Sequence, residues 1–347
     1  MTSRKTALVV CPGRGTYNKS ELGYLSRHHG HRKDMLSVFE GIRTQAGQVS
    51  VEALDAAERY QVSTHTRGDN ASLLIHACAY GDFLSIDNIQ YEPIAITGNS
   101  MGWYIALACA GAVTMETGAR IVNGMGTIMQ EHLIGGQFVY PLVDENWIEV
   151  SGRRAEINTA LNEINTDLGL QVFISIELGG MIVFAGSDEG LAALKGRLPV
   201  IDRFPLELAN HAAFHTGLQA ENSARGFSAF AAELFDQPSI PLIDGRGKIW
   251  HGRDADPGEL HNYTFGHQVV QPFDFTQAIV SGVREFAPDK IIVLGPGSTL
   301  GGAIAQSLIG IGWMGLSSKG DFDALQANDP FLLAMGRADQ RAIVTPE

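Results

Sequence analysis

Residues 93–102 read Pro-Ile-Ala-Ile-Thr-Gly-Asn-Ser-Met-Gly, and this stretch decides the fold. Its first half is a mainly apolar run of the kind that forms a buried strand. Its second half is the pattern G-x-S-x-G, which places a serine on a tight turn. Residues 103–112 continue as an apolar stretch that predicts a buried helix. Strand, turn and helix together predict an α/β fold with Ser100 exposed at the end of a sheet strand.

Ser100 is the candidate nucleophile of this turn. The helix that follows would point its unpaired N–H groups and positive dipole end at developing negative charge. The plainer alternative is a strand-to-helix turn in which Ser100 only caps the helix. A serine nucleophile needs a base, and spacing alone does not choose one. The histidines in the second half of the chain are His211, His215, His251, His261 and His267.

Outward from this turn, apolar runs alternate with helical patterns, which predicts a parallel sheet. Two further buried strands, at 7–11 and 290–294, end at glycine-rich loops. The other expected elements are helices at 24–43, 70–86, 116–132, 217–235, 271–286 and 300–309 and a strand at 240–243. Residues 316–347 show no clear period, and we expect them to be weakly ordered.

Between residues 137 and 208 the pattern changes to β-α-β-β-α-β, the ferredoxin-like arrangement. Its predicted strands are 138–143, 172–176, 181–185 and 202–208, and its helices are 151–168 and 189–198. The predicted fold class is therefore α/β, with a large hydrolase-like domain that carries a parallel sheet and an inserted small ferredoxin-like subdomain. The large domain would comprise residues 1–136 and 209–347, and the subdomain residues 137–208.

The composition is that of a folded chain with a large core and an acidic surface. Of 347 residues, 45% are hydrophobic and 18% are charged, and 25 Lys and Arg against 38 Asp and Glu give a net charge of −13. Nucleic-acid binding needs a basic footprint, and an anionic membrane surface attracts basic segments, so we expect neither partner. The longest apolar stretch, residues 103–113, is too short to cross a bilayer.

Cysteine usage and the first residues predict a cytoplasmic protein. Cys11, Cys78 and Cys109 lie in apolar runs, which favours buried free thiols in a reducing compartment. Residues 2–6 lead into only a short apolar run, unlike a signal peptide. We also predict no metal site.

In the order of its motifs the chain resembles the malonyl-CoA:acyl-carrier-protein transacylase family, which includes the acyltransferase domains of fatty-acid and polyketide synthases. The matching motifs are Pro12-Gly13-Arg14-Gly15, Gly98-Asn99-Ser100-Met101-Gly102, Ala110-Gly111-Ala112-Val113, Met129-Gln130, Ala213-Phe214-His215, Gln268 ahead of Pro272, and Gly295-Pro296-Gly297. Each motif alone is weak. Their collinear order over residues 5–310, around an inserted β-α-β-β-α-β unit, is specific.

The resemblance implies a two-step ping-pong reaction. Ser100 would attack the thioester of an acyl-CoA with His215 as base, and the phosphopantetheine thiol of an acyl carrier protein would then take the acyl group. The backbone N–H groups of Met101 and Arg14 would form the oxyanion hole, and the carbonyl of Gln268 would orient His215. The implied partners are acyl-CoA and an acyl carrier protein, with no permanently bound cofactor. Fatty-acid and polyketide pathways remain equally open.

The departures from the family concern the acyl pocket. Malonyl-selecting members carry an arginine at the position of Met125, and a methionine cannot pair with a carboxylate. The acyl group is thus either neutral or held by another cation, for which Arg14 is the candidate. Asn99 replaces a histidine beside the nucleophile, and Phe214 either narrows the pocket or belongs to the core. His211 is the rival base, and we expect it to be a wall of the same pocket.

An acidic carrier protein would dock on a local basic patch. The candidates are Arg153-Arg154 and the pair Lys195 and Arg197 on the subdomain helices, and more weakly the cluster 28–33, although each could be an ordinary solvated face. Two other functions stay open: a thioester hydrolase on the same fold, and a non-catalytic subunit that docks carrier proteins. An ordinary esterase is disfavoured by the inserted unit.

Overall fold

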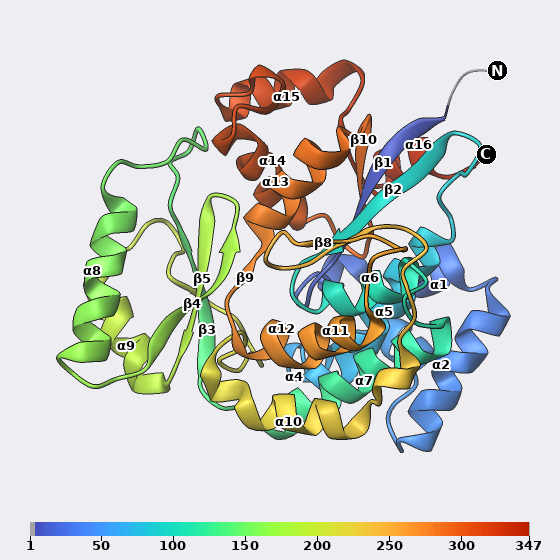
Figure 1. The fold of residues 1–347 in the computed structure, drawn as a ribbon, viewed down its shortest axis with the longest axis horizontal. Helices are drawn as coiled ribbons and strands as arrows, with labels where there is room; N and C mark the ends of the chain where they lie inside the picture. Colours follow the sequence, from blue (N-terminus) through green and yellow to red (C-terminus); the bar gives the residue numbers. More distant parts are fainter. Residues whose placement is uncertain (1–3, 347) are drawn as a thin grey trace.

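Two sheets organise the chain in the computed structural model, which describes residues 4–346 (Figure 1). The larger sheet has the order β11-β10-β1-β2-β7-β8. Its strands are β1 (Lys5–Cys11), β2 (Tyr91–Gly98), β7 (Leu242–Ile243), β8 (Ile249–Trp250), β10 (Lys290–Val293) and β11 (Leu332–Ala334). Every neighbouring pair is parallel except β7 and β8, so the predicted parallel sheet is confirmed.

Helices cover both sides of this sheet. The helices outside the unit of the second sheet are α1 (Tyr24–His29), α2 (Lys33–Gln45), α3 (Val51–Asp55), α4 (Val62–His65), α5 (Gly68–Phe83), α6 (Gly102–Cys109), α7 (Met115–Glu131), α10 (Ala220–Ala229), α11 (Pro257–Asn262), α12 (Gln268–Val270), α13 (Phe275–Phe286), α14 (Leu300–Gly310), α15 (Lys319–Asn328) and α16 (Ala338–Val344). Figure 1 shows α13 and α14 on one side and α5, α6 and α7 on the other. Short 3₁₀ turns lie at Lys19–Glu21, Gly217–Gln219, Ala232–Leu234 and Trp313–Gly315, and a π-helical turn at Tyr263–His267.

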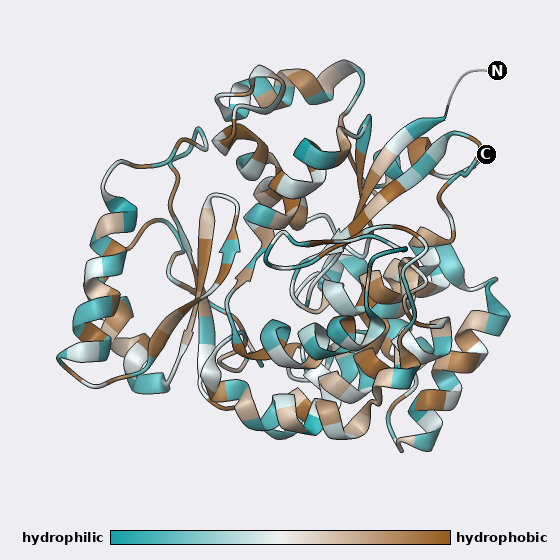
Figure 2. Ribbon diagram, in the orientation of Figure 1, coloured by the Kyte–Doolittle hydropathy of each residue, from teal (hydrophilic) through white to brown (hydrophobic). Residues whose placement is uncertain are grey.

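The second sheet has the order β6-β3-β5-β4-β9. Its strands are β3 (Gly136–Pro141), β4 (Val172–Leu178), β5 (Met181–Gly186), β6 (Leu206–Glu207) and β9 (Phe273–Asp274), and it is joined by α8 (Arg153–Thr166) and α9 (Asp188–Arg197). The first four strands pair antiparallel in the ferredoxin-like order. A separate buried cluster, with Phe138, Ile157 and Phe184, fills the space between these strands and helices. Figure 2 shows hydrophobic segments in these strands and a mixed pattern on α8.

The predicted fold class is thereby confirmed, whereas the domain boundaries remain a proposal. The strand β9 lies outside residues 137–208 and yet pairs parallel with β4. Residues 1–3 and 347, which the proposed large domain includes, lie outside the described residues. Among residues 4–346, no helix has both the length and the hydrophobicity that a bilayer crossing requires.

Several predicted elements are shorter than their patterns suggested. The predicted helix 24–43 is two helices, because the chain turns at Gly30. The predicted helix 217–235 has its α-helical part at α10, which ends at Ala229. The predicted helix 271–286 begins only at Phe275, because Asp274 caps it by accepting a hydrogen bond from the Gln277 N–H (2.7 Å). The predicted strand 202–208 is reduced to β6, after Pro205, which lacks an N–H for the ladder.

The expectation that residues 316–347 are weakly ordered is wrong for residues 316–346, and residue 347 lies outside the described residues. They form α15, the edge strand β11 and α16, and the side chains of Leu333 and Val344 are fully buried. The aspartates that interrupted the sequence pattern have local roles instead. The carboxylate of Asp321 accepts hydrogen bonds from Ser317 and Ser318 at the start of α15.

A buried charged cluster ties this C-terminal segment to the rest of the fold. The carboxylate of Asp82 on α5 accepts from Arg341 on α16 (2.5 Å), from the Tyr24 hydroxyl (2.7 Å) and from the Gly295 N–H (2.8 Å). It also lies 2.8 Å from His29 Nε2. Since His29 and Asp82 have no exposed surface, the cluster 28–33 is not simply a solvated face.

Candidate active site

The serine turn lies where β1 and β2 end side by side. The register pairs Cys11 with Gly98, so the loop after β1 and the turn after β2 leave the sheet together. Ser100 has a φ of +54°, a left-handed conformation that residues other than glycine seldom adopt and that the sharp strand-to-helix turn requires here. A Cβ on Gly98 would lie 2.3 Å from the backbone of Gly102, and one on Gly102 would lie 2.4 Å from the Cys11 carbonyl. Glycine at both positions therefore permits this turn.

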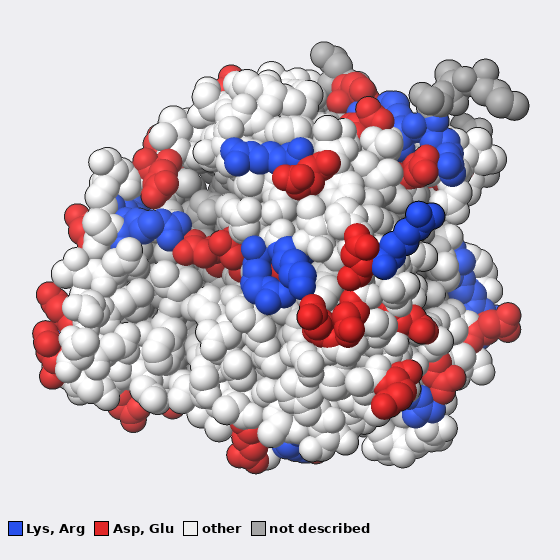
Figure 3. All heavy atoms as spheres, in the orientation of Figure 1, with Lys and Arg blue, Asp and Glu red and all other residues white. Residues whose placement is uncertain are grey.

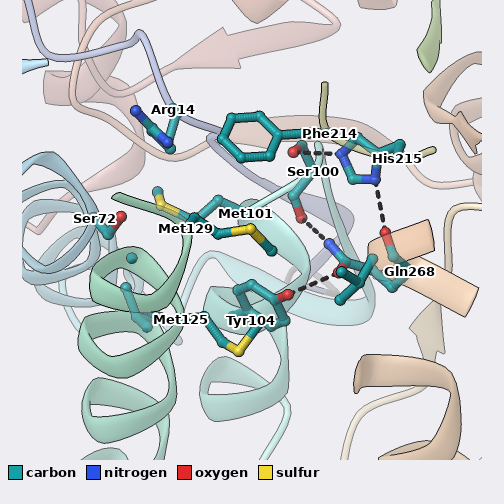
Figure 4. A pocket seen from close by; sticks show the side chains of 13 residues that line it. Arg14, Ser72, Ser100, Met101, Tyr104, Met125, Met129, Phe214, His215 and Gln268 are labelled. Atoms are coloured by element: carbon teal, nitrogen blue, oxygen red, sulfur yellow. Dashed lines mark hydrogen bonds between the residues drawn. The ribbon is translucent and has the colours of Figure 1, made fainter. Parts of the chain in front are cut away.

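The structure brings Ser100 and His215 together (Figure 4). Ser100 Oγ lies 2.8 Å from His215 Nε2, and His215 Nδ1 lies 2.7 Å from the backbone oxygen of Gln268. A carbonyl oxygen can only accept, so Nδ1 carries the hydrogen and Nε2 is free to accept the hydrogen of the serine hydroxyl. The imidazole is thus oriented without a carboxylate.

The Gln268 side chain also fixes the turn. Its Nε2 donates to the backbone oxygen of Ser100 (3.1 Å), and its Oε1 accepts from the Tyr104 hydroxyl (2.8 Å). The sequence analysis did not single out Tyr104. The available signal was a phenol within a helix, α6, that is otherwise almost entirely apolar, because a buried hydroxyl needs a partner.

Burial sets the protonation state of the candidate base. Desolvation lowers the pKa of His215 to about 4, although its hydrogen bond to the Gln268 carbonyl raises it in part. His215 is therefore neutral at neutral pH, as a general base must be.

We expect the rate of Ser100 acylation to fall only as the pH drops through about 4, well below the ordinary histidine value of 6.5. The sign follows from the mechanism, because the protonated imidazole cannot accept the serine proton and the lowered pKa delays its protonation. Quenched-flow measurement of acyl-enzyme formation at saturating acyl-CoA would give this half-point, with circular dichroism at each pH to confirm folding. A half-point between pH 6 and 7 in folded protein would contradict the assignment.

Two backbone N–H groups are available as an oxyanion hole. Met101 follows Ser100 directly, and Arg14 lies in the loop after β1. A Cβ on Gly13 would lie 2.7 Å from the Asn99 carbonyl, which shows how closely this loop packs on the serine turn. Neither N–H donates a hydrogen bond to another of residues 4–346.

Two cavities adjoin Ser100. The inner one, about 50 Å³, is lined mainly by apolar side chains, including Met125, Met129 and Phe214. The outer one, about 440 Å³, is a cleft between the serine turn and the second sheet, and Asn99, His211 and Phe214 line it. Met125 and Phe214 thus lie where the sequence analysis expected pocket walls, and Asn99 and His211 face the outer cleft. His211 Nδ1 pairs with the Gln137 side chain (2.7 Å), not with Ser100.

Arg14 lies between the two cavities and lines both. Its Nη2 donates to the carbonyl oxygens of Thr66 (2.9 Å) and Asn210 (2.7 Å), and its guanidinium carbon lies 5.3 Å from the centre of the Phe214 ring. Burial lowers the pKa of Arg14 to about 10, and the charge of Asp69 partly opposes this shift. The guanidinium therefore remains charged at neutral pH.

Of the four cations predicted as docking patches on α8 and α9, three pair with carboxylates, whereas Arg153 donates to the backbone oxygens of Pro141 and Val143 (3.3 Å each). Arg154 contacts Glu177 through two hydrogen bonds (2.8 and 3.1 Å). The other ion pairs are Lys195 with Glu207 and Arg197 with Glu163. Figure 3 shows positive and negative side chains interspersed on this face of the molecule. Arg154, Lys195 and Arg197 therefore do not form an unneutralised docking patch.

A serine turn at the end of a parallel sheet, a histidine held by a carbonyl and two N–H groups without a partner among residues 4–346 are the groups that acyl transfer of the serine–histidine class requires. Solved structures identify the variant of the fold. The crystal structure of malonyl-CoA:ACP transacylase from Synechocystis sp. PCC 6803 matches with a TM-score of 0.74 and 19% identity, over 97% of this chain and 98% of that one. A type II PKS acyl-carrier protein in complex with its malonyl-transacylase matches with a TM-score of 0.75 and 18% identity, over 98% and 99%.

Sequence comparison points to the same group, although no protein-family model matches the chain. The malonyl CoA-acyl carrier protein transacylase of Synechocystis sp. is 25% identical over 226 residues, which are 59% of this chain and 72% of that protein. The phenolphthiocerol synthesis polyketide synthase type I Pks15/1 of Mycobacterium marinum is 25% identical over 317 residues, 88% of this chain. This chain spans only 14% of that synthase. The resemblance to the malonyl-CoA:acyl-carrier-protein transacylases is confirmed, and the chain has their fold.

Proposed function

We propose that the protein is an acyltransferase that moves a malonyl or other short acyl group from CoA to the phosphopantetheine thiol of an acyl carrier protein. The observation that carries this proposal is the 2.8 Å contact between Ser100 Oγ and His215 Nε2, at the junction of the two cavities. The fold shared with malonyl transacylases supports it.

In the first step His215 Nε2 takes the hydroxyl proton as Ser100 Oγ attacks the thioester carbonyl. The N–H groups of Met101 and Arg14 stabilise the oxyanion, and loss of one such donor typically costs about 10²–10³-fold in rate. The C–S bond then breaks, and the departing CoA sulfur takes the proton from His215. The product is an ester of Ser100.

In the second step the same groups act in reverse. The carrier thiol gives its proton to His215 as its sulfur attacks the ester carbonyl. Collapse of the tetrahedral intermediate releases Ser100 Oγ, which takes the proton back. CoA and phosphopantetheine are both substrates in this scheme, so no permanently bound cofactor and no metal is involved.

The two cavities suit the two parts of such a substrate. The small inner cavity accommodates a short acyl group, and the larger outer cleft accommodates the pantetheine arm. Apolar side chains of the second sheet, among them Val139, Ile176 and Val183, line the cleft. They suit a largely uncharged arm, which excludes water from the ester while it occupies the cleft.

The test is the fate of the acyl-enzyme. We expect radiolabelled acyl-CoA to leave a stable label on Ser100 that holo-carrier protein removes and that apo-carrier protein, which lacks the thiol, does not. Mass spectrometry of the peptide that contains Ser100 identifies the labelled residue. Rapid release of free acid without a carrier would make the protein a hydrolase, and absence of any label would overturn both enzymatic functions.

We also propose a cytoplasmic location. Its support is that Cys11, Cys78 and Cys109 are all free and buried, as a reducing compartment allows.

A further inference from the structure

The inner cavity contains one cation without a counter-ion. Among the described residues that line it, only Arg14 carries a full charge at neutral pH. Asp69 is the acid whose charge acts on Arg14, and it is engaged by Arg67 through two hydrogen bonds (3.0 and 2.7 Å). Arg14 is half-buried, and leaving its guanidinium without a counter-ion costs free energy, so we expect an anion to complete this site in use.

The guanidinium is fixed in place with part of it left unpaired. Nη2 is held from two sides by the carbonyls of Thr66 and Asn210, which accept hydrogen bonds but contribute no negative charge. Nε and Nη1 are buried, and neither has a hydrogen-bond partner among residues 4–346. Figure 4 shows Arg14 beside Phe214, on the side of Ser100 away from Gln268. The Arg14 side chain is therefore positioned before any ligand binds, and its Nε and Nη1 hydrogens are available to a ligand.

We propose that Arg14 selects the acyl group by pairing with a carboxylate at the end of that group opposite the thioester, so that the substrate is a monothioester of a short dicarboxylic acid. This inference rests on the proposed acyltransferase function. It explains how the pocket could bind a carboxylate although Met125 stands at the position of the family's arginine. The cation comes from the loop after β1 instead of from α7. The ion pair also offsets the desolvation cost of both groups, because the substrate carboxylate and the guanidinium each lose water in the pocket.

A phosphate of CoA is a poorer partner for these N–H groups. The inner cavity is small and lined mainly by apolar side chains such as Met125 and Met129, whereas a phosphate would be expected in the open outer cleft. A carboxylate two bonds beyond the thioester carbonyl is compact enough to share the cavity with the reacting carbon.

The experiment compares malonyl-CoA with propionyl-CoA, a neutral ester of equal chain length. We expect the wild-type protein to prefer malonyl-CoA in kcat/KM for acylation of Ser100. In Arg14→Gln this preference, the ratio of the two kcat/KM values, should fall about 10–100-fold, because one charge-assisted hydrogen-bonding group is removed. Arg14→Lys should restore part of it, and the backbone N–H of the oxyanion hole is present in both variants.

The matched control is Arg120→Gln, on the exposed side of α7, where Glu116 is the only partner of the Arg120 side chain among the described residues. It should leave both substrates unchanged. Equal losses with both substrates in Arg14→Gln would show that Arg14 only ties the loops together, and would overturn the inference. A wild-type preference for propionyl-CoA would overturn it as well, while leaving the acyltransferase function intact. If neither ester acylates wild-type Ser100, the proposed function itself fails.

A measurement on the wild-type protein alone covers the case in which the variants do not fold. Sodium malonate should raise the thermal unfolding midpoint more than sodium propionate at equal ionic strength, because only malonate offers both a second carboxylate and the fitting length. Equal shifts for the two salts would count against the inference.

Discussion

Ser100→Ala should reduce acyl-enzyme formation by about 10⁴–10⁶-fold, the loss usual when a nucleophile of this class is removed. The fold should survive, because alanine retains the Cβ and so meets the same left-handed backbone, at a φ of +54°, that serine already adopts. The oxyanion donors and the cavities are also retained, so the variant should still bind acyl-CoA. Intact mass spectrometry after incubation with acyl-CoA gives the acylated fraction directly.

The control for this substitution is Ser228→Ala. Ser228 is an exposed serine on α10, and within the part of the chain that the structure describes its hydroxyl donates only to the Ala224 carbonyl. It should acylate at the wild-type rate. Persistent labelling of Ser100→Ala would place the nucleophile elsewhere. Loss of labelling with retention of the biological activity would instead favour the non-catalytic docking subunit.

The second large effect concerns stability. Arg341→Met should lower the free energy of unfolding by about 3–5 kcal/mol, because it leaves the fully buried carboxylate of Asp82 without its arginine partner. The same substitution removes the contact between Arg341 and the Tyr24 hydroxyl (3.0 Å). Urea unfolding followed by tryptophan fluorescence would report the shift of the midpoint.

Arg337→Met provides the matched comparison, since Arg337 is exposed and its one ion pair within residues 4–346 is with Asp339 at the start of the same helix. Its effect should stay within about 0.5 kcal/mol. Tyr24→Phe is the milder probe should Arg341→Met fail to fold, and we expect a loss of about 1–2 kcal/mol from it. Equal midpoints for Arg341→Met and Arg337→Met would contradict the view that α16 is anchored through Asp82.

The sequence predicted best those parts that local constraints determine. Within twenty residues, an apolar run predicts the strand β2, two glycines around Ser100 predict the turn, and a second apolar stretch predicts α6. The β-α-β-β-α-β unit was recognisable for the same reason, since each element carries its own period. The resemblance then added His215 and Gln268, which lie 115 and 168 residues beyond Ser100.

What the sequence could not give are contacts set by tertiary packing. The clamp on Arg14 comes from Thr66 and Asn210, whose carbonyls are backbone groups and leave no mark on residue type. The sequence pattern wrongly predicted weak order for the C-terminal segment. The strand β11 has only three residues, and its structure depends on pairing with β10, which the pattern does not reveal. That Nε and Nη1 of Arg14 lack a hydrogen-bond partner among residues 4–346 likewise depends on the tertiary surroundings, not on residue type.

The strand β9 constrains how this fold can be recombined. It pairs with β4 and follows Gln268 by five residues, and on the same sheet Ser175 donates to the carbonyl of Phe214 (2.8 Å), the residue before His215. The orientation of the His215 imidazole thus depends on the second sheet in two ways, through the pairing of β9 with β4 and through the hydrogen bond from Ser175 to Phe214. A chimaera that exchanges residues 137–208 for those of a relative must therefore also carry that relative's segments around positions 214 and 273. Without them, the outer cleft would come from the relative while His215 would no longer be oriented correctly toward Ser100.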